Sequence, residues 1–237
     1  MRVGIMQPYF FPYIGYWQLM NAVDKYVIYD DVNYIKGGWV NRNRILVNGR
    51  PQYFNVPMSG ASPFKLIKEV EVNNDGRIIE KNMRILEGAY RNAPYYKDVC
   101  PLMRRILFCD KPDLAEYITE LFYVVCEYLD IKTELIRSSS LEKDCSLKGQ
   151  DKVISICKYL HATEYYNAIG GQQLYSYSDF QRQGIKLCFL RTNKITYRQF
   201  DNEFQENLSI IDVMMFNSRE DIKRMLTEYE VILGEED

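Results

Sequence analysis

The residues of this chain best suited to chemistry lie close to its N-terminus. Asp30 and Asp31 follow the apolar run at residues 26–29, and Arg42 and Arg44 come soon after. A carboxylate at a strand end can act as a general base, bind a hydroxyl or ligate magnesium, and arginine binds phosphate or carboxylate through paired hydrogen bonds. We therefore predict that these four residues are catalytic. Because adjacent strand residues point to opposite sides, only one aspartate should face the site. Taken alone, the segment also fits a charged turn.

A proline- and aromatic-rich segment, QPYFFPYIGY, occupies residues 7–16. Its layout resembles the opening of nucleotidyltransferase-like folds, in which a His-x-Gly-His sequence begins the first helix. Here the spacing is kept as Tyr13-Ile14-Gly15-Tyr16, without the histidines. Tyrosine can donate a hydrogen bond to phosphate but supplies no cation at neutral pH, and Gly15 would allow an anion to approach the backbone at a helix start. The alternative is an aromatic helix that only packs on the sheet.

A third polar segment follows the apolar residues 164–166. Two glycines between a strand and a helix can expose backbone N–H groups to an anion, although such turns also need glycine for conformational reasons. A fourth segment, residues 208–217, reads as a helix packed on the sheet with Asp212 hydrogen-bonded inward. The residues that we predict to bind substrate or nucleotide are Gln7, Pro8, Tyr9, Tyr13, Gly15, Tyr16, Lys36, Trp39, Asn41, Asn43, Asn167, Gly170 and Gly171.

Composition excludes several classes of function. The 237 residues carry a net charge of −2, which argues against a nucleic-acid coat or a polybasic membrane patch and leaves a local basic site open. The single histidine, His161, and scattered cysteines do not provide a zinc site or a Ser-His-Asp triad, so we predict no metal ligands. His161 should lie at the surface near a helix end. We expect reduced thiols, a cytoplasmic protein, and neither a secretory leader nor a membrane span.

Strand and helix patterns alternate along most of the chain. The strands expected in the main sheet are residues 2–6, 26–29, 134–137, 164–166 and 185–190. Asn48-Gly49 predicts a hairpin between residues 43–47 and 52–56, and residues 68–72 read as a further strand. Three helical pieces at residues 76–130 form either an insertion packed on the sheet or a subdomain, and residues 206–237 read as C-terminal helices. We predict a single α/β domain over residues 1–237, with a mostly parallel, doubly wound sheet resembling nucleotidyltransferase-like (HUP/Rossmann-like) folds, an added β-hairpin and a helical insertion.

In such a sheet, ligands bind outside the carboxyl ends of the strands, near the point where strand order reverses. The loops expected on that side are residues 7–12, 30–31, 138–140 and 167–171. They contain the polar clusters of the chain, so we place the site there.

Four motifs together resemble the WbqC-like family over nearly the whole chain: QPYFFPYIGY at residues 7–16, YDDV at 29–32, WVNRNR at 39–44 and LSIID at 208–212. The resemblance implies a role in bacterial surface-polysaccharide (O-antigen) biosynthesis, with glycine transfer as a suggested activity. Our leading hypothesis is therefore a transferase that adds an aminoacyl group such as glycyl to an amino sugar. A sugar nucleotide would be its small-molecule partner, and ATP and Mg²⁺ its cofactors.

Two alternatives stay open. One is a nucleotidyltransferase-like enzyme acting on a sugar phosphate, which the missing histidines disfavour. The other is a non-catalytic module that binds a sugar nucleotide.

Overall fold

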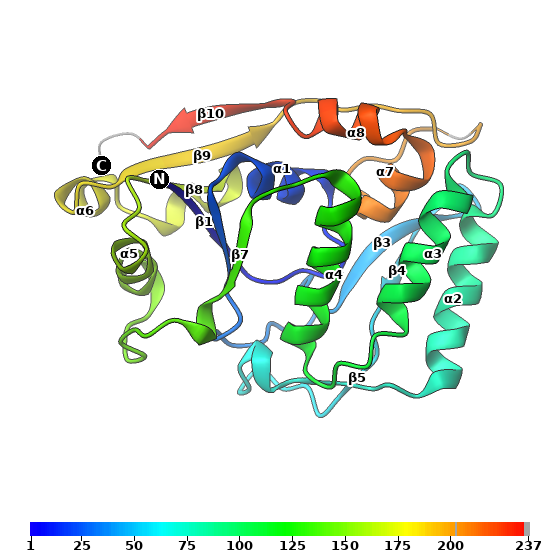
Figure 1. Ribbon diagram of the computed structural model, residues 1–237, viewed down its shortest axis with the longest axis horizontal. Coiled ribbons are helices and arrows are strands. Elements are labelled where there is room, and N and C mark those ends of the chain that lie inside the picture. Colours follow the sequence, from blue (N-terminus) through cyan, green and yellow to red (C-terminus); the bar gives the residue numbers. More distant parts are fainter. Residues whose placement is uncertain (202, 235–237) are drawn as a thin grey trace.

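The computed structural model of the protein describes residues 1–201 and 203–234, and its centre is a six-stranded sheet (Figure 1). The strands are β1 (Arg2–Met6), β2 (Lys25–Ile28), β7 (Glu134–Arg137), β8 (Glu164–Ala168), β9 (Lys186–Thr192) and β10 (Tyr229–Leu233). Their order is β10-β9-β8-β1-β2-β7. Strands β1, β2, β7, β8 and β9 run parallel, and β10 pairs antiparallel with the edge of β9. The predicted mostly parallel α/β sheet is confirmed, and its strand order reverses between β1 and β8.

Helices cover both faces of this sheet because both faces are apolar. In β9, Leu187 and Phe189 join one hydrophobic cluster, whereas Cys188 and Leu190 join the other. Helices α5 (Gly149–Tyr159) and α6 (Tyr177–Arg182) contribute to the first cluster. Helices α1 (Ile14–Ala22) and α4 (Leu114–Leu129) contribute to the second.

Gly15 lets α1 pack closely against the end of β9. A Cβ atom at this position would lie 2.5 Å from Thr192 Oγ1 and 2.5 Å from the Tyr13 ring. Real Cβ contacts are never this short, so the close approach of helix and strand explains the glycine. This packing role is separate from the anion-binding role that the sequence suggested.

The predicted hairpin is present as a separate two-stranded sheet. It joins β3 (Arg42–Val47) to β4 (Arg50–Asn55) in antiparallel register. Asn48 and Gly49 have φ angles of 51° and 74°, the left-handed pair that a type I′ turn requires. The hairpin shares its hydrophobic core with α1 and α4.

The expected strand at residues 68–72 is mostly wrong. Residues Ile67–Glu69 form a short 3₁₀ turn, η1, in which the Glu69 side chain accepts a hydrogen bond from the Leu66 N–H. Only β6 (Glu71–Val72) is extended, and it pairs with β5 (Met58–Ser59). A local side-chain cap therefore prevails over the alternating pattern of the sequence.

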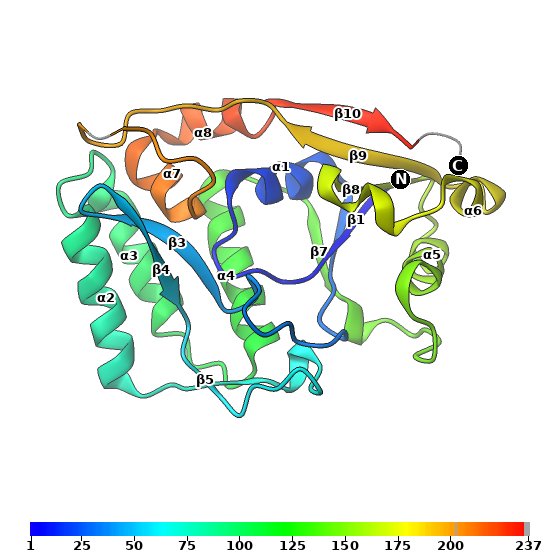
Figure 2. The same cartoon turned by 180° about the vertical axis from the view of Figure 1, so that it is seen from behind.

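Three helices occupy the region predicted to be helical. They are α2 (Gly76–Tyr90), α3 (Tyr96–Leu107) and α4, with breaks at the expected Ala93-Pro94 and Asp110-Pro112 positions. Figures 1 and 2 show them side by side at the end of the molecule that holds the hairpin. Short 3₁₀ turns η2 (Ser138–Ser140) and η3 (Ile169–Leu174) follow β7 and β8.

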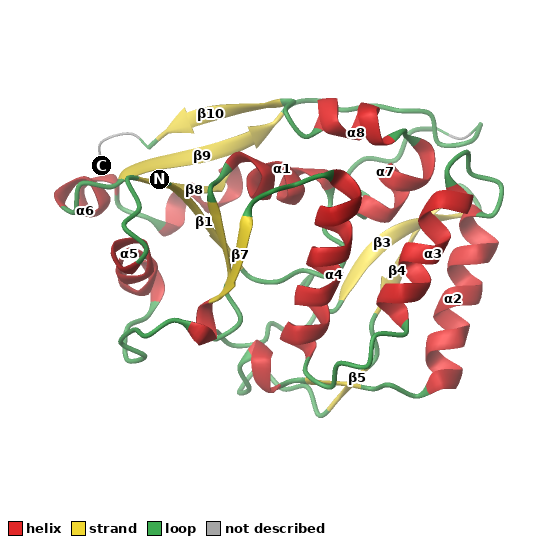
Figure 3. Ribbon diagram, in the orientation of Figure 1, coloured by secondary structure: helices red, strands yellow, loops and turns green. Residues whose placement is uncertain are grey.

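The C-terminal region begins with two helices, as predicted, but ends in a strand. Helices α7 (Ile210–Phe216) and α8 (Arg219–Met225) precede β10 (Figure 3). The helical prediction is wrong for residues 229–233, because the sequence YEVIL pairs with the open edge of β9. The part of that prediction at residues 235–237 lies outside the described residues.

Three further expectations concern the cysteines, His161 and membrane-spanning helices. The six cysteines are free thiols, and His161 is exposed directly after α5, as predicted. Within residues 1–201 and 203–234, no helix has both the length and the apolar character needed to cross a bilayer.

The hairpin turn provides a stability test with a matched control. Gly49→Ala places a side chain at φ 74° and should lower the free energy of unfolding by about 1–2 kcal/mol. Gly88→Ala lies in α2, where an added Cβ meets nothing within 4 Å, and should raise it by about 0.5–1 kcal/mol. Urea denaturation monitored by circular dichroism measures both. Equal effects of the two variants would contradict the turn assignment.

Candidate functional site

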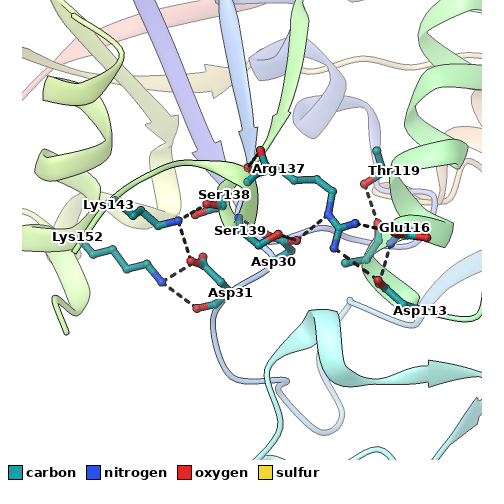
Figure 4. A network of polar contacts seen from close by, with 12 residues as sticks. Asp30, Asp31, Asp113, Glu116, Thr119, Arg137, Ser138, Ser139, Lys143 and Lys152 are labelled. Atoms are coloured by element: carbon teal, nitrogen blue, oxygen red, sulfur yellow. Dashed lines mark hydrogen bonds and ion pairs between the residues drawn. The ribbon is translucent and has the colours of Figure 1, made fainter. Parts of the chain in front are cut away.

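A buried ionic cluster lies at the carboxyl ends of β2 and β7 (Figure 4). Asp30 is fully buried. Its Oδ2 accepts hydrogen bonds from Arg137 Nε at 2.8 Å and Ser139 Oγ at 2.6 Å, and its Oδ1 accepts one from the Ser139 N–H at 2.9 Å. Both carboxylate oxygens are therefore engaged. This arrangement favours a positioning role for Asp30 over the predicted catalytic one.

Arg137 links Asp30 to the start of α4. Its guanidinium lies 3.1 Å from Glu116 and 3.5 Å from Asp113. Burial alone would lower the pKa of Arg137, but the hydrogen bond to Asp30 and the surrounding carboxylates raise it above its ordinary value. The guanidinium stays charged and joins two strands to a helix.

Asp31 points to the opposite side from Asp30, as expected, although both residues lie beyond the end of β2 at Ile28. Its Oδ2 lies 2.9 Å from Lys143 Nζ, and its Oδ1 lies 3.1 Å from Lys152 Nζ. Lys152 also donates to the Asp31 carbonyl at 2.8 Å and lies 4.9 Å from the centre of the Tyr29 ring. Burial pushes the pKa of Asp31 up, but hydrogen bonds from Lys143, Ser138 and Lys152 hold it below its ordinary value. Asp31 is therefore an ionised carboxylate.

Oδ1 of Asp31 is a weakly satisfied acceptor in this cluster. It is buried and has an ion pair with Lys152, but no well-aligned hydrogen bond. Among residues 1–201 and 203–234, no group of three His, Cys, Asp or Glu side chains could hold a metal ion. The available chemistry at Asp31 is thus acceptance of a hydrogen bond, or binding of an ammonium or hydroxyl group.

The proline-rich loop after β1 is held from within. Tyr16 Oη donates to the Gln7 carbonyl at 2.7 Å, and Asn43 Nδ2 donates to the carbonyls of Phe10 and Phe11 at 3.2 and 2.9 Å. Tyr16 and Asn43, both buried, therefore position this loop.

The side chains left open on the same loop belong to Tyr9 and Tyr13, while Pro8 is buried. Burial raises the pKa of both half-buried phenols. They remain neutral hydrogen-bond donors, suited to the oxygens of a polar ligand.

The outer face of the hairpin combines cations and rings. The Arg42 guanidinium lies 4.4 Å from the centre of the Tyr53 ring, Arg44 lies 5.9 Å from that of Trp39, and the two ring centres are 6.3 Å apart. Arg44 Nε is buried and has no hydrogen-bond partner among the described residues. Two neighbouring rings, tilted by 40° to each other, beside such a donor suit a planar or sugar ring that carries a phosphate or carboxylate.

The remaining predicted residues of this region support the loop around that face. Arg42 also donates to the Gly38 carbonyl at 3.2 Å. Asn41 Oδ1 accepts a hydrogen bond from Tyr34 Oη at 2.9 Å, and Lys36 is exposed. Asn41 is therefore structural, and Lys36 is open to a ligand.

In the loop after β8, two of the predicted residues have structural roles and one is accessible. Asn167 is buried, and its Nδ2 donates to Tyr165 Oη at 2.7 Å and Tyr175 Oη at 2.9 Å. A Cβ at Gly171 would lie 3.0 Å from Asn167 Oδ1, whereas one at Gly170 would meet nothing within 4 Å. Asn167 and Gly171 thus shape the loop, and Gly170 is its open position.

Asp212 lies inside the protein, as predicted. Its carboxylate accepts hydrogen bonds from Tyr90 Oη at 2.8 Å, Tyr197 Oη at 2.7 Å and Gln199 Nε2 at 2.7 Å. Burial raises the pKa of Asp212 above its ordinary value, despite these three donors. The contacts tie α7 to α2 and to the chain before it.

The sheet register brings the three strand-end loops together. Met6 is opposite Ile28 in β2, and continuing the β1–β8 register from Gly4 and Tyr166 places it opposite Ala168. Gln7 therefore emerges between the loop that carries Asp31 and the one that carries Gly170. Arg42, Arg44 and Trp39 form a second group on the hairpin, joined to the first by the hydrogen bond from Phe10 N–H to the Trp39 carbonyl at 3.1 Å.

A cavity of about 430 Å³ lies elsewhere, between α5 and α6. Its lining includes Asp151, Lys158, Asp179 and Arg182, and none of the predicted site residues. Asp179 is bonded to Arg182, and Lys158 to Gln183, so this polar lining is largely self-satisfied. The strand ends hold the buried charges and the open donors, and we therefore place the site there.

The sequence did not reveal several residues of the cluster. Arg137 ends a predicted strand beside Ser138–Ser140, which was a usable signal. Lys143 and Lys152 belong to a loop and a helix whose local patterns do not mark them, and Tyr53 lies on a strand read only as hairpin. These side chains meet Asp31 or Trp39 only through tertiary structure.

Asp31→Asn tests the cluster through its pH dependence. Leaving Lys143 and Lys152 without their carboxylate should lower the free energy of unfolding by about 3 kcal/mol at neutral pH. Because folding lowers the pKa of Asp31 from 3.8, its contribution is present above that pH and lost as pH falls through the folded pKa. The gap between wild type and variant should therefore narrow in acid, as measured by urea titrations at several pH values. Asp110→Asn, at an exposed site, is the control, and a gap that does not change with pH would contradict the assignment.

Comparisons with known proteins agree with the motifs. The WbqC-like protein family matches residues 7–224 of the chain. The uncharacterized protein Rv1507c of Mycobacterium tuberculosis (strain ATCC 25618 / H37Rv) is 29% identical over 223 residues, which cover 91% of this chain and 93% of that protein. No solved structure matches. The chain belongs to the WbqC-like protein family.

Proposed function

We propose that the protein is a transferase acting on a sugar intermediate of bacterial surface-polysaccharide biosynthesis, and that it adds an aminoacyl group, glycyl, to an amino sugar. The observation that carries the proposal is the meeting of the β1, β2 and β8 loops where strand order reverses. In open α/β sheets this is where ligands bind. The parallel strands follow the order 3-2-1-4-5 known from nucleotide-binding folds, which supports a nucleotide-linked substrate. Free cysteines suit a cytoplasmic reaction.

Contacts between side chains support a continuous binding surface across these strands. Burial, with Asp31 and Tyr175 nearby, raises the pKa of Tyr29. Tyr175 in turn bonds to Asn167 of the β8 loop. The Asp31 cluster and the β8 loop are thus neighbours across the end of β1.

Each open position has a role in this proposal. Tyr9, Tyr13 and the Gly170 backbone donate to phosphate oxygens. Arg44 binds the negative charge that develops on the activating group when its bond to the acyl group breaks. Asp31 accepts a hydrogen bond from the attacking amine, and its carboxylate offsets the positive charge that forms on nitrogen.

ATP with Mg²⁺ is the activating cofactor in this scheme. The Asp30 oxygens are used by Arg137 and Ser139, and the Asp31 oxygens face two ammonium groups. The chain therefore contributes few oxygen ligands, and Mg²⁺ would be held mainly by phosphates, as is common for this ion. ATP supplies the energy of acyl activation when bound.

The experiment is an incubation of the protein with ATP, Mg²⁺, glycine and nucleotide-linked amino sugars, followed by mass spectrometry. A sugar nucleotide heavier by one glycyl residue is expected. Pyrophosphate release from a nucleoside triphosphate and a sugar phosphate without glycine would instead favour nucleotidyl transfer. Saturable sugar-nucleotide binding without turnover would favour a binding module.

Arg44→Lys tests the arginine role and keeps the charge. Lysine loses the planar fork that binds an oxyanion at two points, so kcat/KM for glycyl transfer should fall about tenfold or more, the equivalent of one charge-assisted hydrogen bond. Arg91→Lys, exposed at the end of α2, is the matched control. Equal kcat/KM values for the two variants would show that Arg44 does not take part in the reaction.

A further inference from the structure

The charges of this chain are segregated along its sequence. Residues 32–68 contain six basic residues and no Asp or Glu: Lys36, Arg42, Arg44, Arg50, Lys65 and Lys68. The segment thus carries +6, and the rest of the chain must carry −8 to give the whole −2. A net charge near zero therefore hides a strongly basic layer, which consists of the hairpin and the two loops beside it.

These six cations have no ion-pair partners among the described residues, although basic residues elsewhere form seventeen ion pairs. Glu69 lies next to the segment, but its carboxylate caps the Leu66 N–H. The positive charge of the layer is not neutralised within the described chain. It is free to attract an anionic partner.

Large apolar side chains are exposed in the same layer. Phe64 is 92% exposed, Ile35 is 52% exposed and Trp39 is 38% exposed. Phe64 lies in a turn closed by the hydrogen bond from Lys65 N–H to the Ser62 carbonyl at 3.0 Å, and its own N–H donates to Ser62 Oγ. An ordered turn therefore presents the ring to the outside.

Backbone pairing brings the segments that carry Ile35 and Phe64 next to each other. Asn33 and Leu66 form an antiparallel bridge, and Tyr34 N–H donates to the Lys65 carbonyl at 2.9 Å. Ile35 and Phe64 are the residues just beyond the Tyr34–Lys65 pair, and Lys36 and Lys65 are next to them in sequence. Figure 2 shows the cyan loop of residues 60–66 projecting at one edge of the molecule.

We propose that this layer, residues 32–68, docks the protein on an anionic membrane surface. Phe64 and Ile35 would enter the boundary between headgroups and acyl chains, while Lys36, Lys65 and Lys68 contact anionic headgroups. Apolar insertion combined with a basic surround is the chemistry of peripheral membrane binding. A hydrated polyanion such as RNA or an acidic glycan would use the cations and the rings of Trp39 and Tyr53, but would leave the aliphatic Ile35 and the exposed Phe64 without a partner. The proposal does not depend on the reaction proposed above.

The test is sedimentation of the full chain with vesicles of phosphatidylcholine alone and with added phosphatidylglycerol. Binding is expected only to the anionic vesicles, and it should weaken as salt is raised. Phe64→Ala should lower the partition coefficient about tenfold, since an inserted aromatic ring is lost. Lys65→Glu should lower it about fivefold or more, given the contribution of each basic residue near an anionic surface.

Matched controls separate the layer from general surface effects. Phe108→Ala and Lys97→Glu alter the same residue types at exposed positions of the α3 region and should bind as the wild type does, and Phe64→Trp should retain binding. Thermal melting confirms that each variant folds. Equal binding to both vesicle types, no binding to anionic vesicles, or unchanged binding of Phe64→Ala would overturn the proposal. Binding to heparin without vesicle binding would assign the layer to an acidic polymer, and glycyl transfer is measured separately without vesicles.

Discussion

A charged carboxylate buried at the end of a strand must be compensated, and Asp30 imposes this constraint on much of the structure. Its charge has no access to water, so it requires donors from the protein. Arg137 and Ser139 at the end of β7 supply them. The charge of Arg137 is balanced in turn by Asp113 and Glu116 at the start of α4. One carboxylate thereby fixes how a strand, its neighbour and a helix from another part of the chain meet.

The next residue, Asp31, points in the opposite direction and forms a second cluster, whose net charge has the opposite sign. Here two lysines share one carboxylate, so the local charge is positive, whereas the Arg137 cluster is negative. A positive environment beside the β1 and β8 loops suits a phosphate-bearing ligand. The Asp30 cluster supplies rigidity, and the Asp31 cluster leaves one buried oxygen without a well-aligned hydrogen bond. The two adjacent aspartates thus have different partners, although both lie beyond the end of β2 at Ile28.

Local patterns predicted the elements of the fold well where the signal was itself local. The five parallel strands were visible as short apolar runs, and Asn48-Gly49 identified the hairpin because only a left-handed pair closes such a turn. Strand β10 was missed because YEVIL becomes a strand only beside the free edge of β9. Lys152 was missed for a similar reason, since 121 residues separate it from Asp31. Asn43, Tyr16 and Asn167 were chosen for their polar groups, but burial shows that those groups hold loops in place. Sequence showed which side chains can bond, and only packing showed which bonds are already made.

Charged residues form ion pairs at the strand ends, whereas the basic residues at positions 32–68 form none among the described residues. At the strand ends, cations and carboxylates are paired at short distances. Along residues 32–68 the cations have no such partners, and mutual repulsion among them lowers stability. Acidic residues are abundant elsewhere in the chain, so their absence here does not reflect composition. Arg44 belongs to this segment and keeps a buried donor open, while Phe64 projects from the same layer. The hairpin of the candidate site and the basic segment are therefore continuous in the chain, and a partner held by that segment would lie beside the candidate site.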